Sequence, residues 1–243
     1  GGSTPSLPWT VRVGSVVLTG NRAEYGLLNH RPAAGFDPSF IVLSTLDLVV
    51  DSIYNRGADI ALQIRRMAFT ERSGLTVSDM TGDIGMDASG ISLAGVTLKT
   101  PFSRIEANIS AGEGILALAP DSPLKAVLTA DVNTKDLKYL YPALIPPVLD
   151  GRIVSLALTA AGTLGDIGKA GLDISSPGHV AFTADGAARN VLDPGRMEAS
   201  ARFEGDFRDM AFLEALLPDS ALRRRIAIPD RIWLHGTAGA DKG

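Results

Sequence analysis

The eight residues Met197-Glu198-Ala199-Ser200-Ala201-Arg202-Phe203-Glu204 alternate strictly between apolar and polar side chains. Because successive side chains of a β-strand point to opposite faces of the sheet, this period of two predicts a strand with one apolar and one solvated face. The same alternation recurs along the chain. Its apolar sets include Met80, Ile84 and Met86; Ile105, Ala107 and Ile109; Ala126, Leu128 and Ala130; Val154, Leu156 and Leu158; and Val180, Phe182 and Ala184.

Further strands are predicted near residues 9–13, 41–50 and 60–69, and groups of Gly, Pro, Asn and Asp separate the runs at short intervals. Short strands with regular turns are typical of a meandering antiparallel sheet. We therefore expect a mainly β fold with more than about 40% of the chain in strands, well above the average domain. About 12 strands spaced roughly 4.8 Å apart make an elongated sheet about 55 Å long.

Two of the predicted strands change phase midway. In residues 60–69 the apolar positions are even as far as Ile64 and odd from Met67. In residues 91–98 they are odd as far as Leu93 and even from Val96, with Gly95 between them. A β-bulge shifts the phase by one residue in this way, and Gly is common there. A short turn between two strands explains the pattern equally well, so both interpretations remain open.

Two segments have helical spacing after a capping-type start, and we predict short helices near residues 135–145 and 207–217. Each helix is followed by a strand that ends in Ala and Gly, which makes a repeat whose second copy stops at the C-terminus. A recurring unit of this kind indicates an elongated array, and we expect the chain to be a piece of a longer protein. We divide it into a flexible start with a cloning scar (1–8), a curled sheet segment (9–132) and continuous helix-plus-strand repeat units (133–243).

The composition argues against several kinds of site. The 243 residues include no cysteine and three well-separated histidines, and the net charge is -4. Thiolate chemistry is therefore excluded, a zinc site or a His-based catalytic centre is poorly supplied, and the basic excess of a nucleic-acid binder is missing. The carboxylates are scattered over predicted outward faces, so no acid–base pair can be named. We expect no enzyme activity, no metal and no cofactor.

Four local motifs have simple structural interpretations. Ser122-Pro123-Leu124-Lys125 matches Ser-x-x-Lys but is better explained as a loop before a strand. Asp131, Asn133 and Asp136 loosely resemble a cation loop and fit helix capping better. Arg223-Arg224-Arg225 is either a solvated linker or a contact for anionic lipid headgroups. His179 is predicted to be exposed on the polar side of its strand.

Two stretches resemble a known family. Ile64-Arg65-Arg66-Met67-Ala68-Phe69-Thr70-Glu71-Arg72-Ser73-Gly74-Leu75 resembles a block in large envelope proteins of Bacteroidota identified as the translocation and assembly module subunit TamB. Leu98-Lys99-Thr100-Pro101-Phe102-Ser103 resembles the strand of that family that runs into Thr-Pro-x-Ser. The helix-then-strand unit in residues 136–162 is similar to the wider AsmA-like superfamily. The resemblance covers roughly residues 9–239.

The resemblance implies a periplasmic segment of a very long protein anchored in the inner membrane. It implies a β-sheet curled into a U-shaped groove with an apolar interior, a β-taco-like shape. It also implies phospholipid transport or outer-membrane biogenesis between the two membranes, in which the full-length protein contacts the inner membrane and an outer-membrane barrel protein. The expected partners are phospholipid acyl chains, and no nucleic acid is expected.

A sheet with one apolar face must cover that face with another sheet, with helices or by curling. Only two short helices are predicted and aromatic residues make up 6% of the chain, so a curl with room inside is favoured over a filled sandwich. The alternative is a structural scaffold domain with a closed core and no ligand. The residues predicted to line the groove are Ile105, Ile109, Leu128, Leu156, Leu158, Val180, Phe182, Met197, Ala201 and Phe203. Those predicted to face solvent are Glu106, Glu198, Arg202 and Glu204.

Overall fold

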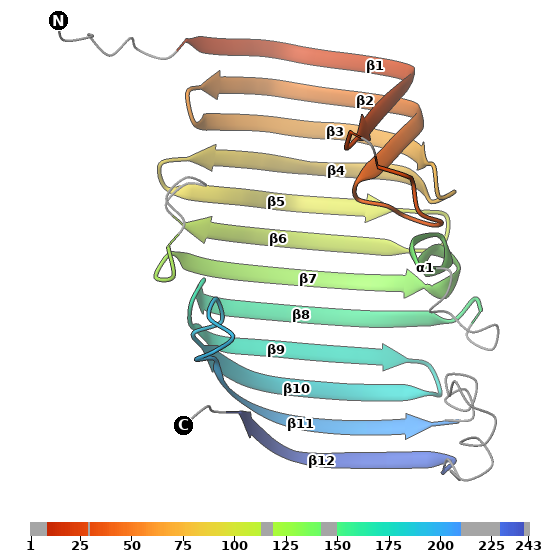
Figure 1. The fold of residues 1–243 in the computed structure, drawn as a ribbon, viewed down its shortest axis with the longest axis vertical. Coiled ribbons are helices and arrows are strands. Elements are labelled where there is room, and N and C mark those ends of the chain that lie inside the picture. Colours follow the sequence, from red (N-terminus) through yellow and green to blue (C-terminus); the bar gives the residue numbers. More distant parts are fainter. Residues whose placement is uncertain (1–8, 29, 113–118, 142–149, 210–228, 241–243) are drawn as a thin grey trace, which may run out of the picture.

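The computed structural model describes residues 9–28, 30–112, 119–141, 150–209 and 229–240. They form one antiparallel sheet of twelve strands, whose order in space is their order in the sequence (Figure 1). The sheet is curled and does not close on itself, and 71% of the described residues lie in strands, which confirms the prediction of a mainly β fold.

The strands and the helix follow one another along the sheet. Their bounds are β1 Thr10–Gly26, β2 Phe40–Arg56, β3 Asp59–Glu71, β4 Thr76–Asp87, β5 Gly90–Lys99, β6 Arg104–Gly112, β7 Pro123–Asn133, α1 Thr134–Leu140, β8 Ile153–Thr163, β9 Ile167–Ser176, β10 Val180–Arg189, β11 Glu198–Arg208 and β12 Arg231–Ala240. Strand β9 lies outside the predicted set, although Ala170, Leu172 and Ile174 alternate in it with Gly171, Asp173 and Ser175.

Both phase changes are β-bulges, so the bulge interpretation is correct and the turn interpretation is wrong. In β3 the pairing with β4 shifts between Ile64 and Met67, and in β5 the pairing with β6 shifts between Leu93 and Val96. Gly95 has φ +57°, a left-handed conformation that Gly adopts without steric cost. Each bulge returns the following apolar residues to the face that the preceding ones occupy.

A single helix, α1, is present in the described part of the chain. Asn133 caps it, because its side chain accepts a hydrogen bond from the backbone N–H of Lys135 at 3.0 Å. The helix ends before Tyr141, earlier than predicted, since the residue preceding a proline is disfavoured in the α conformation. The predicted start of the second helix is wrong, because residues 207–208 belong to β11. The rest of that segment, residues 210–217, lies outside the described residues.

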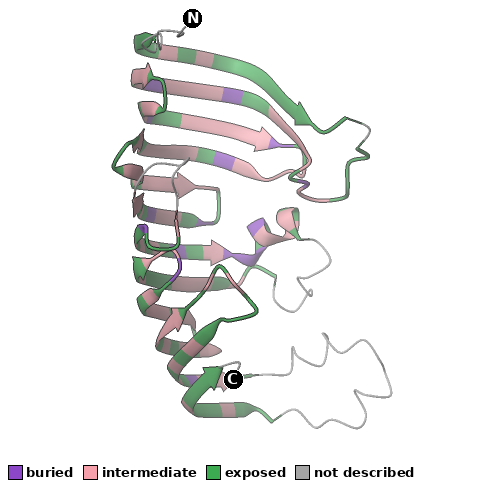
Figure 2. Ribbon diagram, turned by 60° about the vertical axis from the view of Figure 1, so that its left-hand side comes forward, coloured by how far each residue is buried: buried purple, intermediate pink, exposed green. Residues whose placement is uncertain are grey.

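The sheet has no second layer within the described residues. Extensive contacts join each strand only to its neighbours in the sheet, and α1 only to β7. Buried positions are therefore few (Figure 2). The buried apolar residues are Leu46, Val50, Ile64, Val77, Ala107 and Ala130. No helix in the described residues is long and apolar enough to cross a membrane.

Candidate functional site

One face of the sheet is apolar across all twelve strands. Residues that lie directly opposite each other on adjacent strands share a face, so the pairing register defines rows that cross the sheet. The first row consists of Leu18, Leu48, Met67, Met80, Leu98, Ile105, Ala130, Leu156, Ile174, Phe182, Gly205 and Leu234. Every member is apolar or Gly, although the twelve residues come from twelve separate strands.

Two further rows run beside the first on the same face. The second row consists of Val16, Val50, Ile64, Gly82, Val96, Ala107, Leu128, Leu158, Leu172, Ala184, Phe203 and Gly236. The third row consists of Leu62, Ile84, Leu93, Ile109, Ala126, Ala160, Ala170, Gly186, Ala201 and Ala238. We call the face formed by these rows the apolar face.

Eight of the ten predicted lining residues belong to these rows. Ile105, Leu156 and Phe182 lie in the first row, Leu128, Leu158 and Phe203 in the second, and Ile109 and Ala201 in the third. Val180 pairs with Ser176 and Phe207 at the end of its strand, on the same face. Met197 precedes β11 rather than belonging to it, and is 39% exposed.

The residues predicted to face solvent lie on the opposite, polar face. Glu198, Arg202 and Glu204 are exposed, as predicted. Glu106 is only half-buried rather than fully exposed, because it lies beside Arg104, whose Nη2 is 2.5 Å from its Oε1. The register predicted for the second half of the sheet is therefore correct.

The ten residues predicted to line the groove include none from β1 to β5, β9 or β12, although Met80, Ile84 and Met86 of β4 were recognised as an apolar set. In the first row, the lining residues of these strands are Leu18, Leu48, Met67, Met80, Leu98, Ile174 and Leu234. In β9 the signal was present, since apolar residues alternate there. In β2, β3 and β5 the bulges break the period of two, so no single phase identifies the apolar side.

The three rows of the apolar face contain no charged residue, and from β7 to β12 the face is not filled. Within the described strands, the one charged side chain on this face is Glu71, at the very end of β3, where its Oε2 accepts a hydrogen bond from the backbone N–H of Ser73 at 2.6 Å. Leu158, in the middle of the second row, remains 37% exposed. An apolar side chain at the centre of a sheet is normally covered, so this face offers apolar surface to a further molecule.

The two borders of the apolar face differ in how they are held. One border consists of the connections β1–β2, β3–β4 and β5–β6, of α1 and of the connection β9–β10, and we call it the helix rim. The opposite border consists of the connections β2–β3, β4–β5, β6–β7, β8–β9 and β10–β11, and we call it the turn rim. Both rims are visible at the two sides of the sheet (Figure 1).

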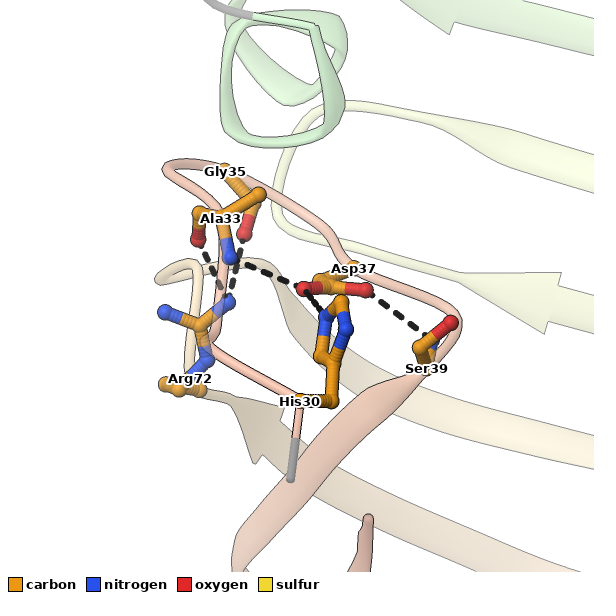
Figure 3. A network of polar contacts seen from close by, with 6 residues as sticks. All are labelled: His30, Ala33, Gly35, Asp37, Ser39 and Arg72. Atoms are coloured by element: carbon orange, nitrogen blue, oxygen red, sulfur yellow. Dashed lines mark hydrogen bonds and ion pairs between the residues drawn. The ribbon is translucent and has the colours of Figure 1, made fainter. Parts of the chain in front are cut away.

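At the start of the helix rim, a polar network orders the connection between β1 and β2 (Figure 3). The buried carboxylate of Asp37 accepts hydrogen bonds from the backbone N–H groups of Ala33 and Ser39, and it lies 2.7 Å from Nε2 of His30. The bond from Ala33, followed by that from His30, lowers the pKa of Asp37 to about 2. Nη2 of Arg72 donates to the carbonyl oxygens of Ala33 and Gly35, at 2.9 and 3.0 Å, and so ties this connection to the end of β3.

Further along the same rim, α1 braces two other connections. The buried carboxylate of Asp136 accepts hydrogen bonds from the hydroxyl groups of Thr100 and Ser103, between β5 and β6. The ring of Tyr139 lies against Gly74, between β3 and β4, so closely that a Cβ there would be 2.9 Å from Cε1. The short helix thus holds together turns that are separated along the sheet, which favours the curl.

The motifs singled out in the sequence have structural positions. Ser122 lies buried in the turn before β7, where its Oγ accepts from the backbone N–H of Ala119, as the loop interpretation predicts. Asn133 caps α1, whereas Asp136 binds a neighbouring turn. His179 is not freely exposed, because its Nδ1 lies 3.4 Å from Asp209. Arg223-Arg224-Arg225 lies outside the described residues. Among the described residues, no three His, Asp or Glu side chains are close enough together to hold a metal ion.

Comparison of the chain with protein-family models, with curated proteins and with solved structures gave no match.

Proposed function

We propose that this chain is a periplasmic segment of an AsmA-like envelope protein of the TamB type, in which the apolar face forms a groove for phospholipid acyl chains on their way between the inner and outer membranes. The observation that carries the proposal is the uninterrupted apolar character of the first row over twelve strands. A structural scaffold needs a packed core, but it has no need for a row that stays uncharged across the whole sheet.

The energetics of such a face suit a lipid tail. Each CH₂ group removed from water gains about 0.8 kcal/mol without any directed contact. The rows cross the strands, which are about 4.8 Å apart, so a row of twelve residues extends for about 50 Å. One acyl chain spans about 15 Å, half of the hydrocarbon core of a bilayer, and several therefore fit along the face.

The absence of charge from the rows matters for movement along them. A charged side chain in an apolar site costs several kcal/mol unless it is paired, and it would divide the face into two parts. The polar face carries many carboxylates and guanidinium groups. The chain therefore has many charged side chains, but it places them on the face opposite the rows. The full-length protein would bring this segment to the inner membrane and to an outer-membrane barrel protein.

The direct test is lipid capture. A photoreactive amino acid at Phe182, on the apolar face, should crosslink phospholipid when the protein is made in a host with a bacterial envelope. The same amino acid at the adjacent residue Thr183, on the polar face, should not. Native mass spectrometry of the purified chain should show bound phospholipid. Equal labelling at both positions, or lipid-free protein, would favour the scaffold interpretation.

A matched pair of substitutions tests the role of charge. Ala160→Asp places a carboxylate in the third row, whereas Ala161→Asp places it on the polar face of the same strand. We expect Ala160→Asp to reduce the amount of co-purifying lipid at least severalfold, because an unpaired charge on the apolar face costs several kcal/mol. Ala161→Asp should leave it unchanged. Circular dichroism checks that both variants keep the sheet, and equal lipid contents in two folded variants would contradict the proposal.

A further inference from the structure

A groove crosses the polar face of the sheet beside the turn rim, over strands β3 to β7. Its volume is about 580 Å³, within the range of sites that hold small ligands. Its floor consists of small residues that lie opposite one another on adjacent strands, namely Ala61, Gly85, Ser92 and Ser110. The next residues in this line, Tyr54 on β2 and Lys125 on β7, are much larger and close the groove at its two ends. Because strands are about 4.8 Å apart, the floor extends for about 15 Å.

The shape of the groove is set by contacts within the protein. A Cβ atom at Gly85 would lie 2.7 Å from Oγ of Ser92, so a larger residue fits there only if its neighbour moves. At one end, the guanidinium group of Arg12 lies over the ring of Tyr54, 5.3 Å from its centroid, and holds the ring in place. The groove therefore exists before any ligand binds, which lowers the cost of binding.

The polar groups of the groove are left unused by the rest of the described chain. The side chains that line the groove and make no hydrogen bond or ion pair within the described residues are those of Tyr54, Asp59, Ser92, Ser110 and Lys125. Their three hydroxyl groups can each donate and accept a hydrogen bond. The two charges lie toward opposite ends of the groove, the carboxylate on β3 and the ammonium group on β7. The groove thus offers free donors and acceptors along its whole length.

The position of the groove argues against two classes of ligand. Strands β3 to β7 are paired on both sides, so their backbone N–H and C=O groups are taken up by the sheet. A peptide therefore cannot bind here by adding a strand. A nucleic acid needs several basic side chains for its phosphates, whereas Lys125 is accompanied in the groove by Asp59 and Asp87. A ligand of this groove must bind through side-chain hydroxyl groups and one positive charge.

We propose that this groove binds a short oligosaccharide that carries one carboxylate. The hydroxyl groups of such a molecule can donate to and accept from Ser92, Ser110 and Tyr54, which face it along the floor and at one end. Its carboxylate pairs with the ammonium group of Lys125 in a charge-assisted hydrogen bond, while Asp59 repels a second carboxylate at the other end. The groove lies on the face opposite the apolar face. The site therefore does not rest on lipid binding, and its failure leaves the proposed function untouched.

The test is an NMR titration of the whole chain with two probes. Sialyllactose is a trisaccharide with one terminal carboxylate, and maltotriose is a neutral trisaccharide. With sialyllactose we expect saturable shifts of the backbone amide signals of Gly85, Gly90 and Gly112, which line the groove. Maltotriose should bind about tenfold more weakly, because it lacks the charge-assisted hydrogen bond. The absence of saturable shifts, or shifts confined to residues outside the groove, would overturn the proposal.

Two matched pairs of substitutions locate the ligand. Ser110→Phe fills the floor and should abolish binding of both probes, whereas Thr159→Phe, on the polar face of β8 outside the groove, should leave it unchanged. Lys125→Gln should weaken the binding of sialyllactose to the level of maltotriose, whereas Lys169→Gln, two strands away on the same face, should not. Dispersed amide signals show that each variant is folded. Unchanged affinity in folded Ser110→Phe would contradict the site, and unchanged affinity in Lys125→Gln would contradict the pairing with a carboxylate.

Discussion

The two halves of the sheet have the same alternating pattern but different apolar side chains. In β3 to β6 the third row consists of Leu62, Ile84, Leu93 and Ile109. In β7 to β12 the same row consists of Ala126, Ala160, Ala170, Gly186, Ala201 and Ala238. Every buried apolar residue larger than Ala in the described chain belongs to β2, β3 or β4. One face of one sheet is therefore packed in its first half and open in its second.

The halves also differ in the regularity of their pairing. Register shifts interrupt every pairing from β1–β2 to β5–β6, whereas from β6 to β12 the one shift lies between Gly186 and Ala188. Bulges bend a strand and increase its twist. In the first half, bent strands bring large side chains into contact without a second layer. The difference teaches that an apolar pattern by itself does not produce a core, since bulges and side-chain volume decide whether the face closes.

The two halves of the sheet also differ in the contacts that hold their rims. Arg72, Tyr139 and Asp136 hold the helix rim over the first half of the sheet. In the second half, backbone hydrogen bonds hold the turn rim, where Gly165 donates to Pro120 at 2.6 Å and Val191 donates to Gly165 at 2.8 Å. The packed half is thus braced by side chains around a helix, and the open half by adjoining turns.

The largest expected effect separates the packed half from the open half. Ile64→Ala removes a buried side chain that its neighbours surround, and we expect a loss of about 3 kcal/mol of unfolding free energy. Leu158→Ala shortens a side chain that is already partly in water, and we expect a loss of about 1 kcal/mol. Urea denaturation of both variants measures the two values. Equal losses would show that the two halves are packed alike.

A smaller effect tests the brace between α1 and the turn that follows β3. Gly74 and Gly178 both have positive φ, at +99° and +77°, but only Gly74 lies against another side chain, that of Tyr139. Gly178→Ala should cost about 1 kcal/mol for its backbone conformation alone. Gly74→Ala should cost more, because the ring of Tyr139 must also move. In a Tyr139→Ala background the two glycine substitutions should become equal, and a persistent difference would place its cause elsewhere.

The smallest expected effect is the dependence of the unfolding free energy on pH, which one carboxylate in each half of the sheet should produce. The pKa of Asp37 is lowered to about 2 by the backbone N–H of Ala33 and by His30, and that of Asp206 to about 2 by Arg231 and Arg208. A lowered pKa in the folded state adds stability that is complete above the unfolded pKa of about 4 and is lost as the pH falls through about 2. Unfolding free energies measured between pH 5 and pH 2 should therefore fall for the native chain, and fall less steeply for Asp37→Asn and Asp206→Asn. Identical slopes for all three proteins would contradict this account.

In the second half of the sheet, the sequence alone predicted which face most residues occupy. From β6 to β11, except in β9, the alternation placed the residues on the correct face, because no bulge intervenes in most of these pairings. In the first half the phase changes were visible in the sequence. Whether each was a β-bulge or a turn could not be decided, because both structures give the same order of apolar and polar residues. The second helix was predicted to begin at residue 207, but residues 206–208 continue β11. They do so because they pair with β12, whose residues lie about 25 positions further along the chain.

A period of two in side-chain polarity is a local property, and it is enough to predict a sheet with one apolar and one polar face, because strand geometry alone relates successive residues. Several features depend instead on residues distant in the sequence and appear only in the folded chain. Ile64 is buried but Leu158 is not; Asp136 binds a turn some thirty residues earlier rather than capping its own helix; and the first and second rows run over all twelve strands. These contacts are set by the bulges and the curl, which bring together side chains whose separation along the chain carries no local signal.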